Sequence, residues 1–386
     1  MQTNDLTPEK LRELADLRPD KARVLSLFVN LDPTEFATPP ARGSEVRSVL
    51  DQAERSIKEL KENDGLTHEQ LTALRADIER AREWFNNGDF DAKGAHGLAL
   101  YLAGPADLFE IVKLPRPVQT NAVIDDSPYI EPIADLGSQK RWGVLLISRR
   151  NGRILRGTSD GLREVDQVWD DTHGQHDQGG WSQARYQRSV EEEKKDHVRA
   201  VLDVLFEHHQ RAPIDCLLVG CNEELYPDVQ AYLHPYLKER LLGRFDVDVE
   251  NTSAEDVLKA AKPAIEKHES QREREALDTL IERVNAGGRG AAGLGDTLEA
   301  LNEQRVEKLL INYGFDEPGA QCPQCGSLYL ADVTECPADG TPTEPREPIT
   351  ESAIERALLQ SAEVHVVRYH AEDLEPLGNI GAVFRF

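Results

Sequence analysis

The decapeptide GGWSQARYQR, residues 179–188, joins a polar loop to a long amphipathic helix. Its two glycines permit backbone angles that other residues resist, which is typical of a loop tip. The preceding loop is rich in His, Asp, Gln and Gly and cannot bury itself. A helix expected over 184–210 then buries one apolar face, whose members are Val190, Val198, Val201, Leu202 and Leu205. The stretch therefore predicts a polar tip at the N-terminus of a long helix.

Such a tip suits phosphate or RNA, because a helix N-terminus offers free N–H groups and the positive end of a dipole. Arg185 and Arg188 lie one turn apart on one helix face. Positive charge gathers here although the net charge of the chain is −25, a balance that does not favour general nucleic-acid binding. The alternative is an ordinary surface loop in which Ser182 begins the helix.

Around this helix the sequence predicts a three-layer α/β domain. A hairpin with a turn at Asn151-Gly152 opens it, and a βαβ-like series follows the long helix. The expected elements are strands at 142–148 and 153–157, a strand at 215–221, a helix at 223–240, a strand at 244–249 and a helix at 254–268.

The flanking segments also alternate strands and helices. The first carries helices at 7–16, 45–62 and 67–86, strands at 24–31, 97–103 and 108–114, and a Pro-rich stretch at 115–132 interpreted as a covering loop or linker. The last carries a charged helix at 268–286, a Gly-rich loop at 286–296, helices at 296–304 and 351–359, and strands at 306–313, 364–370 and 382–386.

A chain of 386 residues is too long for one ordinary core. We therefore expect an α/β fold of three domains, each a mixed sheet flanked by helices: 1–137, 138–270 and 271–386. The third domain is expected to hold a small zinc-ribbon-like insert at 320–346. No run of eighteen apolar residues exists, and the N-terminus lacks an apolar signal core, so we expect no membrane association and a cytoplasmic location.

Three of the five cysteines form a cluster with metal-ligand spacing. Cys322-Pro-Gln-Cys325-Gly and Cys336-Pro-Ala-Asp339-Gly are two tight turns of the kind that make a zinc ribbon. Asp339 holds the position of the fourth ligand. We expect a structural rather than a catalytic zinc, because three thiolates leave little Lewis acidity at an open position. The alternative is a degraded ribbon held by packing alone.

The segment after the loop resembles a known family. Archaeal and eukaryotic release factors carry Gly-Gly-Gln, then Ser, two residues, Arg, an aromatic residue, one residue and Arg, followed by a long charged helix. Residues 179–188 reproduce this spacing, with Trp181 where the family has Gln. The runs GDTLEAL (295–301) with VEKLLI (306–311), and LGNIGAVFRF (377–386), resemble the family's third domain. The chain thus resembles the archaeo-eukaryotic class I release factor and Pelota superfamily, in a bacterial-type form similar to the Vms-like peptidyl-tRNA hydrolases and to the hibernation factor Balon.

The resemblance covers residues 140–386 and implies peptidyl-tRNA hydrolysis in peptide release or ribosome rescue. The family's Gly-Gly-Gln loop reaches the peptidyl transferase centre and positions water against the ester. This carries over to Gly179 and Gly180, and to Gln183 in place of the missing glutamine, since Vms-like enzymes rely on a nearby Gln. The residues implied in RNA binding are Trp181, Ser182, Arg185 and Arg188.

Two alternatives stay open. A Balon-like factor would occupy the vacant A site without hydrolysis, with Trp181 stacked on a ribosomal RNA base. A zinc-ribbon interaction protein acting off the ribosome is the other. The first domain resembles the family's decoding domain only in the order of its elements, and the connection at 61–66 lacks the Asn-Ile-Lys-Ser sequence that reads stop codons. Rescue, quality control or hibernation is therefore expected, with ribosomal RNA and peptidyl-tRNA as partners and delivery by a translational GTPase left open.

Overall fold

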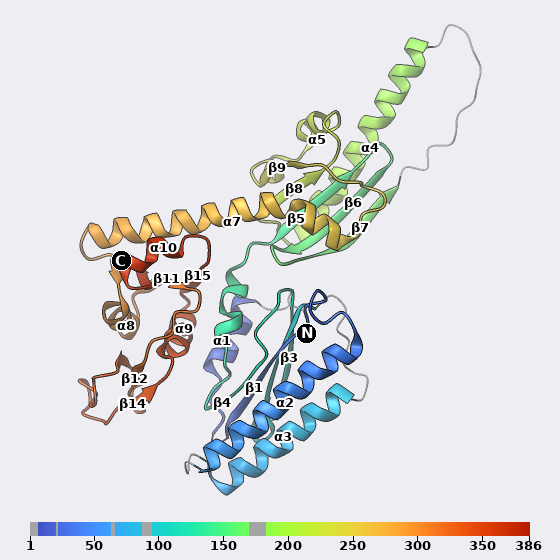
Figure 1. The fold of residues 1–386 in the computed structure, drawn as a ribbon. Coiled ribbons are helices and arrows are strands. Elements are labelled where there is room, and N and C mark those ends of the chain that lie inside the picture. Colours follow the sequence, from blue (N-terminus) through green and yellow to red (C-terminus); the bar gives the residue numbers. More distant parts are fainter. Residues whose placement is uncertain (1–6, 21, 63–65, 87–94, 170–182) are drawn as a thin grey trace. The chain divides into compact units, whose positions relative to one another are not determined.

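The protein is a mixed α/β molecule with several sheets flanked by helices, as the sequence predicts. A computed structural model describes residues 7–20, 22–62, 66–86, 95–169 and 183–386, and gives only the backbone for 183–191. The chain groups into two compact units (Figure 1). One comprises Gln139–Glu269, and the other joins Met1–Ser138 to Ser270–Phe386. The finer division into three domains remains a prediction.

The unit Gln139–Glu269 is built on a five-stranded sheet of order β7-β6-β5-β8-β9. β5 pairs parallel with β8 and antiparallel with β6, so a hairpin and a βαβ unit share one sheet. The strands are β5 (Trp142–Ile147), β6 (Asn151–Thr158), β7 (Gly161–Trp169), β8 (Cys216–Gly220) and β9 (Leu241–Phe245). The helices are α4 (Gln183–Arg211), α5 (Tyr226–Tyr232), α6 (Pro235–Lys238) and the first half of α7 (Ala254–Asn285).

Helices cover both faces of this sheet, because successive strand residues point to opposite sides. Leu145 and Ile147 pack with the apolar stripe of α4, which includes Val198 and Val201. The intervening residues of β5, such as Val144, pack instead against the first half of α7. A strand buried on both faces reads as a continuous apolar run, which is why the WGVLLI sequence predicted it well.

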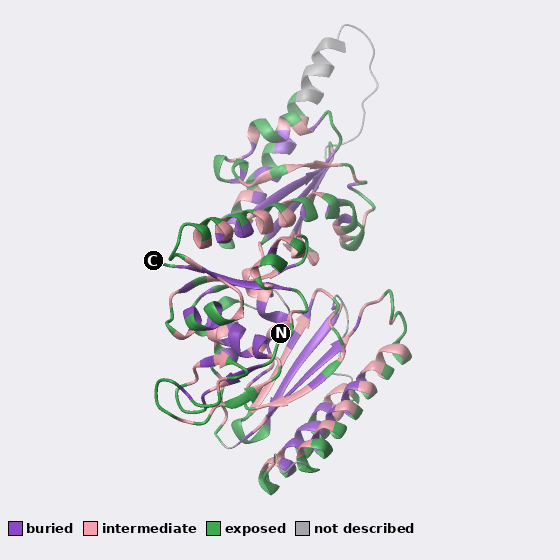
Figure 2. Ribbon diagram, turned by 60° about the vertical axis from the view of Figure 1, so that its left-hand side comes forward, coloured by how far each residue is buried: buried purple, intermediate pink, exposed green. Residues whose placement is uncertain are grey.

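The other unit contains two four-stranded sheets. The first has the order β3-β2-β1-β4 and is entirely antiparallel. Its elements are α1 (Pro8–Asp16), β1 (Val24–Asn30), α2 (Pro39–Glu62), α3 (His68–Asn86), β2 (Gly97–Ala103), β3 (Leu108–Leu114) and β4 (Asn121–Asp125). Leu25, Leu27 and Val29 of β1 pack with α2 and α3, whereas Phe28 packs with Leu11 of α1. Figure 2 shows buried residues along the strands of this sheet.

The second sheet has the order β10-β16-β11-β15. Its elements are β10 (Gly290–Ala292), α8 (Leu294–Asn302), β11 (Val306–Asn312), α9 (Ile349–Leu359), β15 (Glu363–Val367), α10 (Ala371–Leu374) and β16 (Ile380–Phe384). Leu309 and Ile311 face α8 and α9, and Leu310 faces the second half of α7. Short 3-10 helices η2 (Gly104–Ala106), η3 (Glu131–Ser138) and η4 (Glu375–Leu377) join neighbouring elements.

Several elements differ from the sequence predictions. The expected helix at 223–240 is two short helices, because His234 precedes Pro235 and takes an extended conformation that ends α5. The helices expected at 254–268 and 268–286 are one continuous α7, which contains Pro263 but has no Gly or Pro from 264 to 285. The strand expected at 244–249 begins earlier, as β9. The Pro-rich covering loop contains β4, which pairs with β1, and the Gly-rich loop contains β10.

None of the helices in the described ranges is long and apolar enough to cross a lipid bilayer.

Candidate functional site

The cysteine-bearing insert is a three-stranded sheet that carries two matching turns. Its strands are β12 (Gly319–Gln321), β13 (Leu328–Leu330) and β14 (Glu344–Arg346), in the order β13-β12-β14. Asn302 at the end of α8 holds the insert in place, since its side chain bonds both the N–H and the carbonyl of Leu328 at 2.8 Å.

The two turns share one hydrogen-bond pattern. In the first, the Gly326 N–H donates to the Cys322 carbonyl at 2.9 Å; in the second, the Gly340 N–H donates to the Cys336 carbonyl at 2.8 Å. Both glycines have positive φ, +71° and +73°, a conformation that side chains with a Cβ disfavour. Asp339 therefore occupies in the second turn the place that Cys325 holds in the first.

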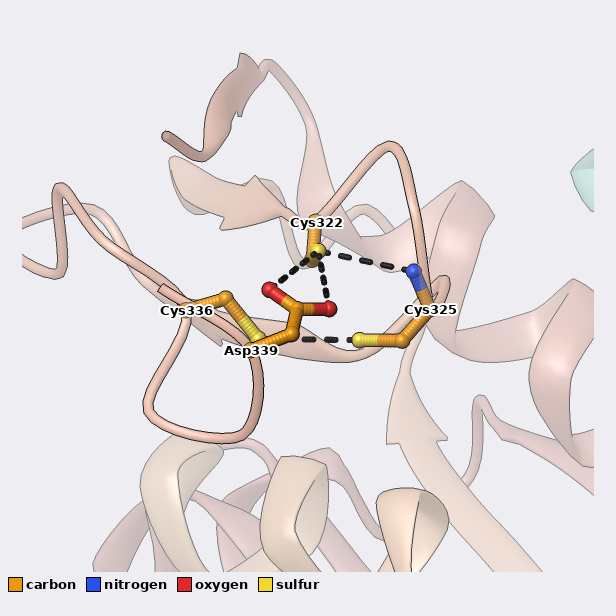
Figure 3. A group of neighbouring side chains, drawn as sticks. All are labelled: Cys322, Cys325, Cys336 and Asp339. Atoms are coloured by element: carbon orange, nitrogen blue, oxygen red, sulfur yellow. Dashed lines mark hydrogen bonds between the residues drawn. The ribbon is translucent and has the colours of Figure 1, made fainter. Parts of the chain in front are cut away.

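The folded turns bring four predicted ligands together (Figure 3). The donor atoms of Cys322, Cys325, Cys336 and Asp339 all lie within 4.8 Å of one another. Cys325 Sγ is 3.6 Å from Cys336 Sγ, and Cys322 Sγ is 3.6 and 3.7 Å from the two Asp339 carboxylate oxygens. Cys322 and Cys336 are buried, whereas Cys325 and Asp339 are exposed. This is the only such cluster among the described residues.

These spacings fit a tetrahedral zinc ion. With Zn–S of about 2.3 Å and Zn–O of about 2.0 Å, the edges of a tetrahedron are roughly 3.8 Å between sulfurs and about 3.5 Å between sulfur and oxygen. The observed separations of 3.6 to 3.7 Å need only small adjustments to meet them. A donor set of three thiols and one carboxylate is also one that zinc accepts. The residues present therefore can bind a metal ion.

Neighbouring groups prepare two ligands for metal binding. The backbone N–H of Thr341 donates to Asp339 at 2.9 Å, and this hydrogen bond is the largest of the effects that lower the pKa of Asp339 to about 2. The Ser327 hydroxyl, with help from its backbone N–H, lowers the pKa of Cys325. Burial acts the other way on Cys322 and raises its pKa. The Tyr329 hydroxyl lies 3.3 Å from Cys336 Sγ.

Sequence reasoning missed these supporting residues, although a signal was present. Ser327 and Thr341 stand at the same position after their turns, in the parallel runs Cys-x-x-Cys-Gly-Ser and Cys-x-x-Asp-Gly-Thr. Two hydroxyl residues in register beside ligands indicate hydrogen bonding to the ligand atoms. Tyr329 carried no comparable signal, because only the strand pairing of β12 with β13 brings it to the cluster.

The predicted catalytic and RNA-binding residues lie at or beyond the start of α4. Gly179, Gly180, Trp181 and Ser182 lie outside the described residues. Gln183, Arg185 and Arg188 belong to the first turns of α4, where the structure gives their backbone. The expected helix at 184–210 is confirmed as Gln183–Arg211.

The described part of α4 is fixed firmly to its sheet. Asp166 of β7 and His208 form a contact of 2.9 Å, and hydrogen bonding to His208 lowers the pKa of Asp166. Arg156 of β6 donates to the His208 carbonyl at 3.1 Å and to the Ala212 carbonyl at 2.5 Å. Gly152 leaves room for Val201, whose Cγ2 lies 2.5 Å from the place where a Cβ would stand. The helix that follows the diglycine therefore has a rigid base.

Comparisons with known proteins agree with this arrangement. Residues 128–266 match the family model described as bacterial archaeo-eukaryotic release factor family 10. Peptide chain release factor subunit 1 of Archaeoglobus fulgidus is 26% identical over 304 residues, covering 72% of this chain and 74% of its own. Its counterpart in Thermococcus kodakarensis is 23% identical over 337 residues, covering 75% and 79%. The chain is thus similar to archaeal release factors over most of its length and to a bacterial family of the archaeo-eukaryotic release factors over residues 128–266.

Solved structures of the superfamily are also similar to this chain. A model of ribosome-bound archaeal Pelota and ABCE1 gives a TM-score of 0.42 at 17% identity, with 73% of each chain covered. Archaeoglobus fulgidus Pelota gives 0.35 at 17% identity, with 75% of this chain and 79% of that chain covered.

One part of the candidate site lies inside the residues that match the family model, and the other lies outside them. The stretch 179–188 and the whole of α4 fall inside residues 128–266. The cysteine cluster lies outside that range and is known here from its own geometry. The match to the family model therefore covers α4 but not the cysteine cluster.

Proposed function

We propose that this protein acts at the ribosome as a translation factor of release-factor type, binding near the A site and releasing peptides, in termination or rescue, by hydrolysis of the peptidyl-tRNA ester. The observation that carries the proposal is the run GGWSQARYQR at the head of a 29-residue helix, inside the segment that matches a release-factor family. The archaeal relatives are named peptide chain release factors, and one solved Pelota is titled as ribosome-bound.

The chemistry needs positioning rather than a nucleophilic side chain. A water oxygen bonds to the ester carbonyl carbon, the bond to the ribose 3′-oxygen breaks, and that oxygen takes up a proton. The negative charge on the carbonyl oxygen needs fixed N–H donors nearby, and the water needs a fixed acceptor. Backbone N–H groups around Gly179 and Gly180 are suited to the first task, and the Gln183 amide is suited to the second, because it both donates and accepts.

A non-hydrolytic role in hibernation or stalling is the second candidate, and Trp181 favours it. Its indole offers one N–H donor and no acceptor, so it cannot hold a water as the family's glutamine does. A large aromatic side chain at a loop tip can instead stack on an unpaired base, which contributes about 1–3 kcal/mol. A factor of this kind would fill the A site and block it.

A release assay on stalled ribosomes separates the two. Purified protein is added to 70S complexes that carry labelled peptidyl-tRNA, and free peptide is measured. We expect release by the wild type and loss of at least tenfold in Gln183→Ala, with Gln187→Ala, one turn further into the same helix, as the matched control. Ribosome co-sedimentation without any peptide release would exclude hydrolysis and support the blocking role. Absence of both would exclude the two ribosomal candidates and favour an interaction protein acting elsewhere.

We also propose that Cys322, Cys325, Cys336 and Asp339 bind one structural zinc ion. Bound zinc would cross-link the two turns of an insert that has only three short strands of its own. Metal analysis of the purified protein should give close to one zinc per chain, and Cys336→Ser should lose it. A full-length protein that contains no zinc when expressed in zinc-supplemented medium would contradict the assignment. Delivery by a translational GTPase stays a prediction.

A further inference from the structure

A cavity of about 440 Å³ lies between α9 and the first cysteine turn, within the unit that joins the two ends of the chain. Three arginines from separate elements reach it. Arg18 follows α1, Arg346 belongs to β14, and Arg356 belongs to α9. Three guanidinium groups at one cavity are notable in a protein whose net charge is −25.

Carboxylates also line this cavity, and most of them are already engaged. Glu355 accepts from Arg18 at 2.6 Å, and Asp126 pairs with Arg23 at 2.7 Å. Glu344 lies 4.0 Å from Arg346, whose Nε donates to the Gln321 side chain at 3.0 Å. Each of these charged side chains therefore has a partner of opposite charge, and one further arginine at the cavity has none among the residues that the structure describes.

Arg356 is the exception. Its side chain makes no ion pair or hydrogen bond with any described residue, and its Nε is buried without an acceptor. Its Nη1 lies over the first turn, 3.6 Å from where a Cβ would stand on Gly326. Arg356 as a whole is half-buried, but its Nε is fully buried, and a buried donor without a partner costs free energy. The group is therefore arranged for an acceptor that the chain itself does not supply.

We propose that this cavity is a binding site for a phosphate group. Besides Arg356, the Ser352 hydroxyl and the Gln321 amide nitrogen line the cavity and have no acceptor among the described residues. A phosphate offers three or more acceptor oxygens to such a set, whereas a carboxylate offers two. The planar guanidinium fork matches phosphate oxygens in pairs, and the volume lies in the range of small-ligand sites.

The phosphate has two conceivable sources, an RNA backbone and a free nucleotide. The RNA source rests on the proposed function, because it would give the acidic body a second contact with ribosomal RNA besides the α4 tip. Phosphate binding itself does not depend on that function. An RNA-backbone site should bind an RNA more tightly than a mononucleotide, whereas a nucleotide site should not. One series of titrations therefore separates the two sources.

The test uses the full-length protein as purified, in buffer without a chelator. Isothermal titration with inorganic phosphate, uridine monophosphate, a ten-nucleotide RNA and acetate is compared for wild type, Arg356→Gln, Arg356→Lys and Arg47→Gln. Arg47 on α2 is the matched control, because it is exposed and has no partner among the described residues. We expect Arg356→Gln to weaken phosphate-containing ligands at least tenfold, Arg356→Lys to weaken them less, and Arg47→Gln to leave them unchanged.

The outcomes are distinct. Tighter binding of the RNA than of the monophosphate, lost in Arg356→Gln, supports an RNA-backbone phosphate. Equal affinity for the RNA and the monophosphate supports a free nucleotide. This conclusion would hold even if the protein released no peptide. Absence of binding by every phosphate probe, equal losses in Arg356→Gln and Arg47→Gln, or binding of acetate as tight as phosphate would each overturn the proposal. Unchanged thermal melting of Arg356→Gln verifies that the variant is folded.

Discussion

At the scale of single residues, Asp339 is the most informative position in the cysteine-bearing insert. It completes a donor set whose other members are thiols, and it is exposed. Thiolate is a softer and stronger ligand for zinc than carboxylate. Asp339 is therefore the weakest of the four ligands, and a metal ion would enter and leave on its exposed side.

Replacing Asp339 by a stronger ligand should make the cluster hold zinc more tightly. We expect Asp339→Cys to slow zinc loss to a colorimetric chelator by about tenfold or more, because the fourth ligand becomes a thiolate. Asp339→Ala should speed the loss, and Asp332→Ala, a change in the same insert away from the cluster, should leave it unchanged. Equal zinc loss in Asp339→Cys and wild type would show that Asp339 is not a ligand.

Glu351 on α9 is a second residue with a measurable consequence. Its carboxylate accepts the backbone N–H groups of Ile130 and Glu131, at 2.7 and 2.9 Å. Burial raises its pKa well above the ordinary value, and the nearby Glu355 and Glu131 add to the shift. A raised folded-state pKa means that the folded protein binds the extra proton. Its stabilisation is complete below about pH 4.5 and is lost as pH rises through the folded value.

Glu351→Gln removes this titration. We expect the unfolding free energy of the variant to fall less steeply than that of wild type as pH rises above about 4.5. Urea denaturation at several pH values measures it, with the exposed Glu69→Gln on α3 as the control. Parallel pH profiles for wild type and Glu351→Gln would show that Glu351 has an ordinary pKa.

At the scale of elements, the position of α4 on its sheet depends on one glycine. A Cβ on Gly152 of β6 would stand 2.5 Å from Val201 Cγ2, in the middle of the helix contact. We expect Gly152→Ala to cost about 1–3 kcal/mol of stability and to reduce peptide release by displacing the diglycine end of α4. Gly43→Ala in α2 meets nothing within 4 Å and should stabilise by about 0.5–1 kcal/mol.

A double variant identifies the cause. Adding Val201→Ala to Gly152→Ala creates room, so part of the lost stability should return relative to the sum of the single changes. The measurement is thermal or urea unfolding of wild type, the two single variants and the double variant, which together form a double-mutant cycle. Strict additivity would locate the defect elsewhere than in the contact with α4.

The sequence predicted elements well where local pattern and burial coincide. β2 and β3 were predicted with their observed limits, because Gly104-Pro105 marks the turn between two apolar runs. β4, β7 and β10 were missed: β7 is half exposed, β4 lies in a Pro-rich stretch and β10 in a Gly-rich one, and their pairing partners lie elsewhere in the chain. The metal-ligand cluster was predicted from spacing, whereas the arginine cavity was not, because Arg18 lies more than three hundred residues before Arg346 and Arg356 in the sequence.

At the scale of the whole molecule, the net charge of −25 would limit the proposed contact with RNA. A body of net charge −25 can contact few phosphates, and the candidates are Arg185, Arg188 and Arg356. Each neutralised phosphate contributes about −0.7 to −0.9 to the slope of log affinity against log salt. We therefore expect a shallow slope of about −2 to −3 for ribosome binding, measured by sedimentation at several salt concentrations. A slope near −8 would mean that many more cations take part.

The unit Gln139–Glu269 begins and finishes at neighbouring points. The ring of Trp142, near its start, stands edge-on to that of His268, near its finish, with centroids 5.6 Å apart. Adjoining ends are typical of a unit that is inserted between two segments of another one, and here those segments are Met1–Ser138 and Ser270–Phe386.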